Sequence, residues 1–174
     1  MKPSPMQPLK RVAIIGCGGS GKTTIGRRIA AVIDAEITHL DAVYYDDEWN
    51  KLPQEKFAQI QEELVAADTW VIDGNYAGTL PIRLRRATHV IFLDLPAITC
   101  LWGIVQRRRR YRGGQHKNDG VYDNINWGFI RYVWGYRREM APRVRALIAA
   151  HAGHAQVHIV RSRRAANRLV EQLT

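Results

Sequence analysis

The segment Gly16-Cys-Gly-Gly-Ser-Gly-Lys-Thr23 matches the phosphate-binding pattern G-x-x-x-x-G-K-[ST] at each fixed position. A β-branched apolar run precedes it at residues 11–15, and apolar residues at helical spacing follow it at residues 24–33. Strand, glycine-rich loop and helix therefore occur in the order that this motif requires. The agreement of both flanks predicts a nucleotide-binding P-loop rather than a chance match in a glycine-rich turn.

Each part of this loop has a role in holding phosphates. The glycines allow the backbone to curl until its N–H groups point at an anion, and the following helix adds its positive end. Lys22 is expected to place its ammonium on the β- and γ-phosphates, and the Thr23 hydroxyl to ligate Mg²⁺. We therefore expect ATP and Mg²⁺ as cofactors, bound by Gly16, Gly18, Gly19, Ser20, Gly21, Lys22, Thr23 and Thr24.

The rest of the chain alternates between expected strands and helices. This alternation predicts an α/β protein with the three-layer P-loop NTPase fold, in which helices cover both faces of a five-stranded parallel sheet. The strands are expected at residues 11–15, 36–40, 69–72, 89–93 and 156–160, and the helices at 24–33, 54–67, 80–86, 98–110, 127–150 and 164–173. In the helix at 98–110, the expected apolar stripe consists of Ile98, Leu101, Trp102 and Val105. Residues 42–53 are expected to form an acidic, aromatic loop, and residues 113–124 a polar loop.

The length of 174 residues suits one domain, which we place at residues 11–174. Residues 1–10 are rich in proline and lack an apolar segment, so they are expected to form a flexible leader. No apolar run approaches the roughly 18 residues that a membrane span needs. The two cysteines have no metal-site or disulfide spacing. We therefore expect a cytoplasmic protein without a membrane partner.

The positive charge of the chain is concentrated in its second half. Residues 1–82 hold 8 basic and 11 acidic side chains, whereas residues 83–174 hold 18 and 5. Almost all of the later basic residues are arginine, whose planar guanidinium suits bidentate contacts with phosphate. They indicate either an arginine-lined cleft for phosphoryl transfer or a nucleic-acid-binding surface, although a solvated basic surface accounts for most of them.

Three aspartates follow predicted strands, at the sheet edge where ligands bind in parallel sheets. Asp73 opens the turn at Gly74-Asn75, and we favour it over Asp94 as the carboxylate that orients Mg²⁺. Asp94 precedes Leu95-Pro96 and can equally serve as a helix cap. Asp41 is expected either to bind the acceptor, as the base for an attacking hydroxyl, or to cap a turn.

Four later segments carry a family resemblance: His39-Leu-Asp41, Asp73-Gly-Asn-Tyr76, Ile91-Phe-Leu-Asp-Leu-Pro96 and Cys100-Leu-Trp102. Together with the P-loop, they resemble the DNA topology modulation protein family, which belongs to the adenylate-kinase-like branch of P-loop kinases. The resemblance extends over nearly the whole chain from Arg11 onward. It implies a sheet with strand order 2-3-1-4-5, a small mobile lid at residues 107–126 and an acceptor-binding segment.

The resemblance also implies roles for single residues. Asp73 matches the aspartate that opens the Asp-Gly-Phe-Pro-Arg segment of adenylate kinases, and Asp41 is similar to the aspartate that holds the acceptor hydroxyl in shikimate kinases. Arg107 matches a lid arginine that contacts the transferring phosphates. Ala77 stands where adenylate kinases carry an arginine for the acceptor nucleotide, and Arg83 is a candidate substitute.

A second departure is Gly103, which stands where related lid helices carry an arginine over the nucleotide base. Within the run at residues 107–110, only one or two side chains can enter a site, because neighbours on a helix point in different directions. We assign Arg107 to the charge of the transition state, with Arg110 or Arg112 as helpers. Four aromatic residues could stack on bases: Trp127, Tyr132, Trp134 and Tyr136. Core packing is favoured instead by the helical spacing of Ile125, Phe129, Tyr132, Val133 and Tyr136. His39 and His116, which lack metal-ligand spacing, are expected to act through hydrogen bonds.

These observations predict an ATP-dependent kinase that moves the γ-phosphate of Mg·ATP to a small acceptor, either a nucleoside monophosphate or a hydroxylated metabolite. The acidic loop and the alanine at position 77 favour a hydroxyl acceptor. The alternative is a nucleotide-dependent nucleic-acid-binding protein that affects DNA topology through its arginine-rich half. The expected catalytic residues are Lys22, Asp41 and Arg107, the metal residues are Thr23 and Asp73, and the acceptor residues are Asp41, Tyr44, Trp49, Asn75, Tyr76 and Arg83.

Overall fold

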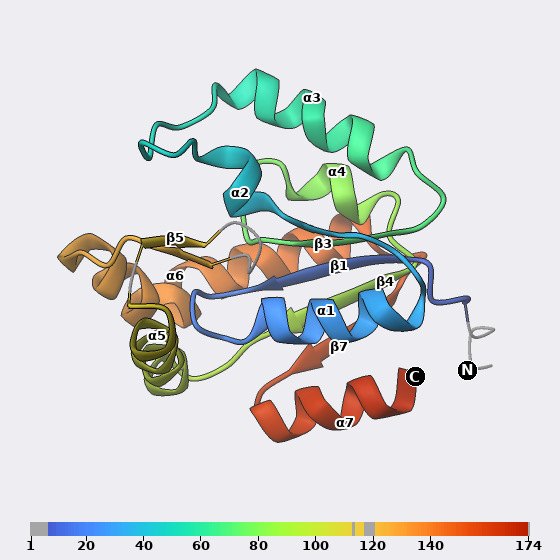
Figure 1. Cartoon of the computed structure of the whole chain (residues 1–174). Helices are drawn as coiled ribbons and strands as arrows, with labels where there is room; N and C mark the ends of the chain where they lie inside the picture. Colours follow the sequence, from blue (N-terminus) through green and yellow to red (C-terminus); the bar gives the residue numbers. More distant parts are fainter. Residues whose placement is uncertain (1–6, 113, 117–120, 174) are drawn as a thin grey trace.

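The computed structural model describes residues 7–112, 114–116 and 121–173. A sheet of five parallel strands runs through its centre (Figure 1). The strand order is β2-β3-β1-β4-β7, so the expected order 2-3-1-4-5 holds when β7 is counted as the fifth strand of this sheet. The strands are β1 (Arg11–Gly16), β2 (Ile37–His39), β3 (Trp70–Asp73), β4 (His89–Leu93) and β7 (Gln156–Val160).

Helices cover both faces of the sheet. Figure 1 shows α1 and α7 together on one side and α3, α4 and α6 on the other, while α5 lies at the carboxyl ends of the strands. The predicted fold class is therefore confirmed. The helices are α1 (Lys22–Val32), α2 (Leu40–Tyr44), α3 (Gln54–Val65), α4 (Leu80–Leu84), α5 (Ala97–Tyr111), α6 (Trp127–His151) and α7 (Arg163–Leu173).

The central strands are apolar because they are buried on both faces. All residues of β3 and β4 are buried, as are Val12 to Gly16 of β1. The register then fixes the site, since Ile14 of β1 pairs with Asp73 of β3, and Asp73 pairs with His39 of β2. The polar residues at these strand ends are therefore brought to one edge of the sheet, next to the P-loop.

Two loops expected from the sequence contain regular structure. The acidic loop at 42–53 begins inside α2, and the polar loop at 113–124 contains the antiparallel strands β5 (Gly114–His116) and β6 (Val121–Asp123). The sequence did not predict this pair of strands, because Gly114, Gln115 and His116 of β5 carry no apolar pattern. α6 also continues through Pro142 to His151.

Of the leader expected at residues 1–10, the structure describes residues 7–10. Residues 1–6 of it lie outside the described residues. From Gln7 onward the chain contacts the domain: the Gln7 side chain donates a hydrogen bond to the His154 carbonyl at 2.6 Å, and Leu9 packs against the core. In the described part of the chain, no helix combines the length and the apolar character that a bilayer crossing demands.

Candidate functional site

The P-loop connects β1 to α1 and requires glycine at two positions. Gly19 and Gly21 have φ angles of +75° and +97°, which side chains other than glycine rarely adopt. A Cβ atom on Gly19 would also lie 2.1 Å from the Cys100 carbonyl oxygen of α5. The Nζ atom of Lys22 donates a hydrogen bond to the Cys17 carbonyl at 2.9 Å, so the ammonium lies across the loop. With α1 beginning directly behind it, this loop forms a suitable cradle for phosphates.

Thr23 and Asp73, the two expected metal residues, lie side by side. The Thr23 hydroxyl donates a hydrogen bond to Oδ2 of Asp73 at 3.2 Å, and Nδ1 of His39 lies 2.9 Å from the same oxygen. An ionised carboxylate only accepts hydrogen bonds, so Nδ1 of His39 carries the proton in this pair. A hydroxyl and a carboxylate beside a phosphate cradle are oxygen ligands of the kind that Mg²⁺ prefers, so this donor set fits the ion.

Asp94, the alternative metal residue, has a different environment. Its side chain is fully buried and accepts hydrogen bonds from Arg137, at 3.2 Å, and from Arg145 of α6. Arg161, after β7, lies 3.9 Å away. The helix cap considered for this residue is also absent, because the N-cap position of α5 is Pro96 and no side chain caps it. Asp94 therefore ties the end of β4 to α6 and leaves Asp73 as the carboxylate at the P-loop.

Asp41, two residues after His39, contacts a cluster of aromatic rings through Tyr76. The Tyr76 hydroxyl donates a hydrogen bond to Oδ1 of Asp41 at 2.5 Å. The ring of Tyr44 lies 5.0 Å from that of Tyr76, and Trp49 lies 5.5 Å from Tyr45. These residues, expected to bind the acceptor, thus form one aromatic wall beside a carboxylate.

The electrostatics of this wall keep Tyr76 protonated. Burial, followed by the charge of Asp41, raises the pKa of the Tyr76 hydroxyl, so Tyr76 remains a donor to that carboxylate. Tyr76 also has a φ angle of +27°, an unusual backbone conformation for a residue with a side chain. Such conformations persist where surrounding contacts fix them and often occur at binding sites.

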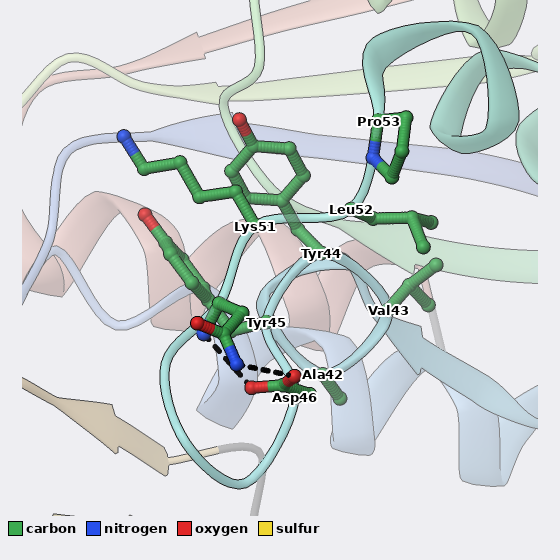
Figure 2. A pocket seen from close by; sticks show the side chains of 9 residues that line it. Ala42, Val43, Tyr44, Tyr45, Asp46, Lys51, Leu52 and Pro53 are labelled. Atoms are coloured by element: carbon green, nitrogen blue, oxygen red, sulfur yellow. Dashed lines mark hydrogen bonds between the residues drawn. The ribbon is translucent and has the colours of Figure 1, made fainter.

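A hollow of about 460 Å³ lies along this segment, lined by residues 42–46 and 50–53. Figure 2 shows Tyr44, Tyr45 and Lys51 on one side of it, and Val43 and Leu52 on the other. The hairpin that forms it is closed by a bridge between Tyr45 and Lys51 and by hydrogen bonds from Asn50 to Asp46. Lys51 is thus a cation that the acceptor segment presents next to the aromatic wall, and the sequence analysis did not identify it.

Two expected acceptor residues have structural partners instead. Arg83 is fully buried, and its guanidinium donates hydrogen bonds to the Gln61 side chain at 2.5 Å and to the carbonyls of Gly74 and Asn75 at 3.2 Å each. Burial lowers its pKa to about 9, so it is still cationic at neutral pH. Arg83 therefore supports the turn after β3 from behind and does not take the place of an arginine at Ala77. The expectation that it contacts an acceptor is wrong, because helix α4 directs it into the core.

Asn75 is likewise held by its neighbours. Its amide donates to the Tyr132 hydroxyl at 2.8 Å, and its carbonyl oxygen accepts from the Tyr136 hydroxyl at 2.8 Å. Both tyrosines come from α6, and burial raises the pKa of each. The side chain of Asn75 therefore connects the turn to α6.

A second cleft, of about 760 Å³, extends from the P-loop to the start of α7. Arg107 and Arg110 of α5 both line it, whereas Arg108 and Arg109 do not. This agrees with the expectation that only part of the arginine run enters a site. Arg112 ends α5 in a left-handed conformation and does not line the cleft. The cleft is lined by residues 19–25, Arg27, Arg28, Gly103, Gln106, Arg107, Arg110, Tyr111, Val121, Arg163, Ala166 and Asn167.

The face that α5 turns to the P-loop differs from the expected apolar stripe. Ile98, Trp102 and Val105 are exposed, by 72%, 52% and 41%, whereas Cys100 and Ile104 are buried. The P-loop approaches α5 so closely that small residues are needed: a Cβ on Gly103 would lie 2.1 Å from the Gly19 carbonyl oxygen. The buried face of α5 is therefore determined by the close approach of its backbone to the P-loop backbone, and not by the positions of its largest apolar side chains.

Arg163 occupies the space beside Gly103. Its Nη2 would lie 2.5 Å from a Cβ at that position, and its Nη1 donates a hydrogen bond to the Gln106 side chain at 3.0 Å. On the same wall, Arg28 donates to the Asn167 side chain at 2.9 Å. α5 has no arginine at position 103, and the guanidinium of Arg163 from α7 lies in the space that such a side chain would enter. Arg163 was not among the predicted site residues, because nothing in its local sequence pattern connects it to position 103.

The segments after α5 reach across to the acceptor side. Gln115 of β5 donates a hydrogen bond to the Asp46 carbonyl at 2.9 Å. Near the start of α6, Phe129 lies so close to the P-loop that a Cβ on Gly18 would be 2.7 Å from its ring. Gln115 of the expected lid region therefore contacts the acceptor segment, whereas Phe129, which follows that region, contacts the phosphate loop.

The histidines named in the sequence analysis both have hydrogen-bonding neighbours. His39 contacts Asp73, and Nε2 of His116 lies 2.9 Å from the Tyr111 carbonyl oxygen. Among the described residues, no three His, Cys, Asp or Glu side chains gather into a metal-binding group. Cys17 and Cys100 are free and buried, and a hydrogen bond between their thiols is the main cause that raises the pKa of Cys17.

Solved structures with the same fold include three kinases. A shikimate kinase from Acinetobacter baumannii in complex with shikimate has a TM-score of 0.57 at 18% identity, covering 94% of this chain and 90% of that one. A deoxyadenosine kinase from M. mycoides with dCMP and dCDP has 0.52 at 13%, covering 93% and 97%. A sugar kinase from Janibacter sp. HTCC2649 has 0.50 at 16%, covering 95% and 92%. The chain therefore has the fold of P-loop kinases.

No family model and no curated protein matches the sequence. The resemblance to the DNA topology modulation family is thus not confirmed and stays a prediction.

Proposed function

We propose that this protein is an ATP-dependent kinase that transfers the γ-phosphate of Mg·ATP to a hydroxyl group of a small acceptor. The observation that carries the proposal is the placement of Asp73. Its buried carboxylate accepts a hydrogen bond from Thr23 of the P-loop and contacts His39, which precedes Asp41 and its aromatic neighbours by two residues. The proposed donor and acceptor sites would thus share one edge of the sheet, with the Mg²⁺ ion between them.

The donor would bind in the cleft of about 760 Å³. The P-loop and Lys22 would hold the β- and γ-phosphates, while Thr23 and Asp73 would hold the Mg²⁺ ion, which neutralises phosphate charge during transfer. Arg163 would offer its guanidinium plane to the base, with Gln106 and Asn167 at the base edge. ATP is the donor that we propose, since the sequence lacks a guanine-specific Asn-Lys-x-Asp motif.

The acceptor would lie between Asp41, Tyr44 and Trp49. Asp41 would accept the proton of the attacking hydroxyl, held in position by the hydrogen bond from Tyr76. Arg83 is buried in the core, so it does not supply the bidentate guanidinium contact that suits a phosphate-bearing acceptor, and Lys51 offers a single ammonium instead. We therefore propose a hydroxylated metabolite rather than a nucleoside monophosphate, and the shikimate bound by one structural neighbour is a compound of this kind.

Catalysis would consist mainly of positioning and of charge neutralisation. Arg107 lines the cleft one turn beyond Gly103, where it would face the transferred phosphoryl group. In related chemistry, an arginine in this role contributes about 10³–10⁵-fold in rate. The two free, buried cysteines agree with the cytoplasmic location that we also propose.

The test is the release of ADP from Mg·ATP across a panel of hydroxylated metabolites and nucleoside monophosphates, using the wild-type protein, Asp41→Asn and Asp94→Asn. We expect stimulation by one class of hydroxylated acceptor, lost in Asp41→Asn and retained in Asp94→Asn. The kinase proposal is contradicted by a panel without any stimulation. Stimulation that survives in Asp41→Asn refutes the role of that carboxylate.

A further inference from the structure

Helix α6 exposes two tryptophans that the core does not use. Trp127 and Trp134 are 78% and 63% exposed, whereas Val133 and Tyr136 of the same helix are buried. Val133 and Tyr136 therefore pack in the core as their helical spacing predicts, whereas Trp127 and Trp134 were not part of that predicted core set and are exposed. Two large, exposed indoles on one helix suggest a contact with a partner.

The two tryptophans alternate with arginines along a single line on α6. Trp127, Arg131, Trp134 and Arg138 are separated by four, three and four residues, and all four are exposed. At about 100° per residue they fall within an arc of about 60°, and they extend over about 17 Å of the helix. We define these four residues as the α6 stripe.

The arginines of the α6 stripe differ from the other arginines near them. Arg137 and Arg145 are paired with the buried Asp94. Arg131 and Arg138, in contrast, have no hydrogen bond or ion pair within residues 7–112, 114–116 and 121–173. Their charge is therefore available to an external anion, and it lies in the half of the chain with 18 basic and 5 acidic residues.

We propose that the α6 stripe binds single-stranded nucleic acid. Unpaired bases present apolar faces that stack on tryptophan, and the phosphates between them are the anions that arginine binds bidentately. The alternation of indole and guanidinium matches the alternation of base and phosphate along a strand. A paired duplex does not fit as well, because its bases are already stacked on one another and not open to an indole face.

A membrane surface is a poorer match for the same residues. A helix that lies in a bilayer interface needs a broad apolar face with its basic residues at the rim. In the α6 stripe, the two arginines lie within the same narrow arc as the tryptophans, and would be forced into the apolar layer with them. Nucleic acid is thus the anionic partner that accommodates both kinds of side chain at once.

The α6 stripe is separate from the proposed catalytic site. Phe129, Val133 and Tyr136 project from the opposite side of α6, where Phe129 approaches the P-loop and Tyr136 holds Asn75. Substitutions in the α6 stripe are therefore expected to leave nucleotide turnover unchanged. This separation also distinguishes a failure of this proposal from a failure of the kinase proposal.

The experiment is fluorescence anisotropy of a labelled oligothymidine of about 12 nucleotides, which matches the size of single-strand sites. Trp134→Ala is expected to weaken binding by about 5- to 150-fold, the loss typical of one stacked base. Arg138→Gln should lower the slope of log affinity against log salt by about 0.7. The control is Trp102→Ala, which removes a tryptophan of α5 that is 52% exposed beside Ile98 and Val105, and which should change affinity less than twofold.

Three results would overturn the proposal. The first is an absence of binding by the wild-type protein at about 50 mM salt, a condition that strengthens phosphate contacts. Trp102→Ala could weaken binding as much as Trp134→Ala, which indicates a diffuse basic surface. Finally, phosphatidylserine vesicles could bind through Trp134 while the oligonucleotide does not, which identifies a membrane partner.

Discussion

Replacing Asp94 by asparagine distinguishes the structural role of Asp94 from the metal-binding role proposed for Asp73. Asp73 ends a buried strand, and Asp94 follows another. Asp94 accepts hydrogen bonds from Arg137 and Arg145, whose side chains are 42% and 38% exposed. Hydrogen bonds to charged groups contribute about 1.5–3 kcal/mol each. Because both guanidinium groups reach water and asparagine keeps one acceptor oxygen, we expect Asp94→Asn to lower the free energy of unfolding by about 2–4 kcal/mol.

For a chain of this length, such a loss lowers the melting temperature by about 5–15 °C. Thermal and urea unfolding would measure the loss, and a double-mutant cycle with Arg145→Gln would show whether it arises from the ion pair. Mg²⁺-dependent nucleotide turnover at a permissive temperature should be unchanged. Asp73→Asn should give the opposite result, with lost Mg²⁺ dependence and a stability change of about 1 kcal/mol or less.

The reasoning is refuted if Asp94→Asn unfolds like the wild type while its Mg²⁺ dependence is lost. That result would return the metal role to Asp94 and make its arginine partners part of the active site. A coupling energy near zero between Asp94 and Arg145 would contradict only the claim that their ion pair stabilises the fold. It would not affect the assignment of the metal role to Asp73.

Three further outcomes follow from the site and the sheet. Tyr76→Phe, which removes the hydrogen bond to Asp41, should lower acceptor-dependent turnover by about tenfold; unchanged turnover would show that Asp41 needs no such support. Arg163→Ala should raise the KM for ATP about 5- to 30-fold and leave inhibition by inorganic tripolyphosphate unchanged, as expected for a contact to the base alone; equal losses for both would contradict it. Burial lowers the pKa of His158, and burial together with His158, whose ring stacks at 5.9 Å, lowers that of His89. The unfolded chain therefore binds more protons below its histidine pKa of 6.5, so the free energy of unfolding should fall as the pH drops from 7 to 5, by at most about 1.4 kcal/mol per unit for each histidine. His158→Gln should flatten this dependence, and an unaltered slope would contradict the assignment.

The sequence predicted the sheet and the P-loop because both depend on local patterns. A strand buried on both faces reads as a continuous apolar run, and the P-loop needs glycines where φ is positive. Once the strand order was expected, the approach of Asp73 to the P-loop followed from its position at a strand end. Its contact with His39 could have been found in the same way, because the two residues pair in register.

The parts that the sequence did not predict depend on tertiary packing. From the sequence, Arg83 was expected to contact the acceptor from a short helix. α4 instead directs its side chain into the core, where hydrogen bonds to its partners offset the cost of burying the charge. The buried face of α5 is set by the approach of the Gly19 backbone, which no apolar periodicity records. Arg163 reaches the cleft from a helix 60 positions after Gly103, and no local pattern links the two.

The central claim is that a phosphoryl group moves from ATP to a hydroxyl, and the fate of the γ-phosphate tests it most directly. Phosphorus NMR of wild-type protein with Mg·ATP and the stimulating acceptor should show a new phosphate ester growing at the rate of ADP formation. Lys22→Met, with its fold verified by unfolding, should form neither product at a measurable rate. Release of inorganic phosphate alone, or full transfer by Lys22→Met, would contradict the account.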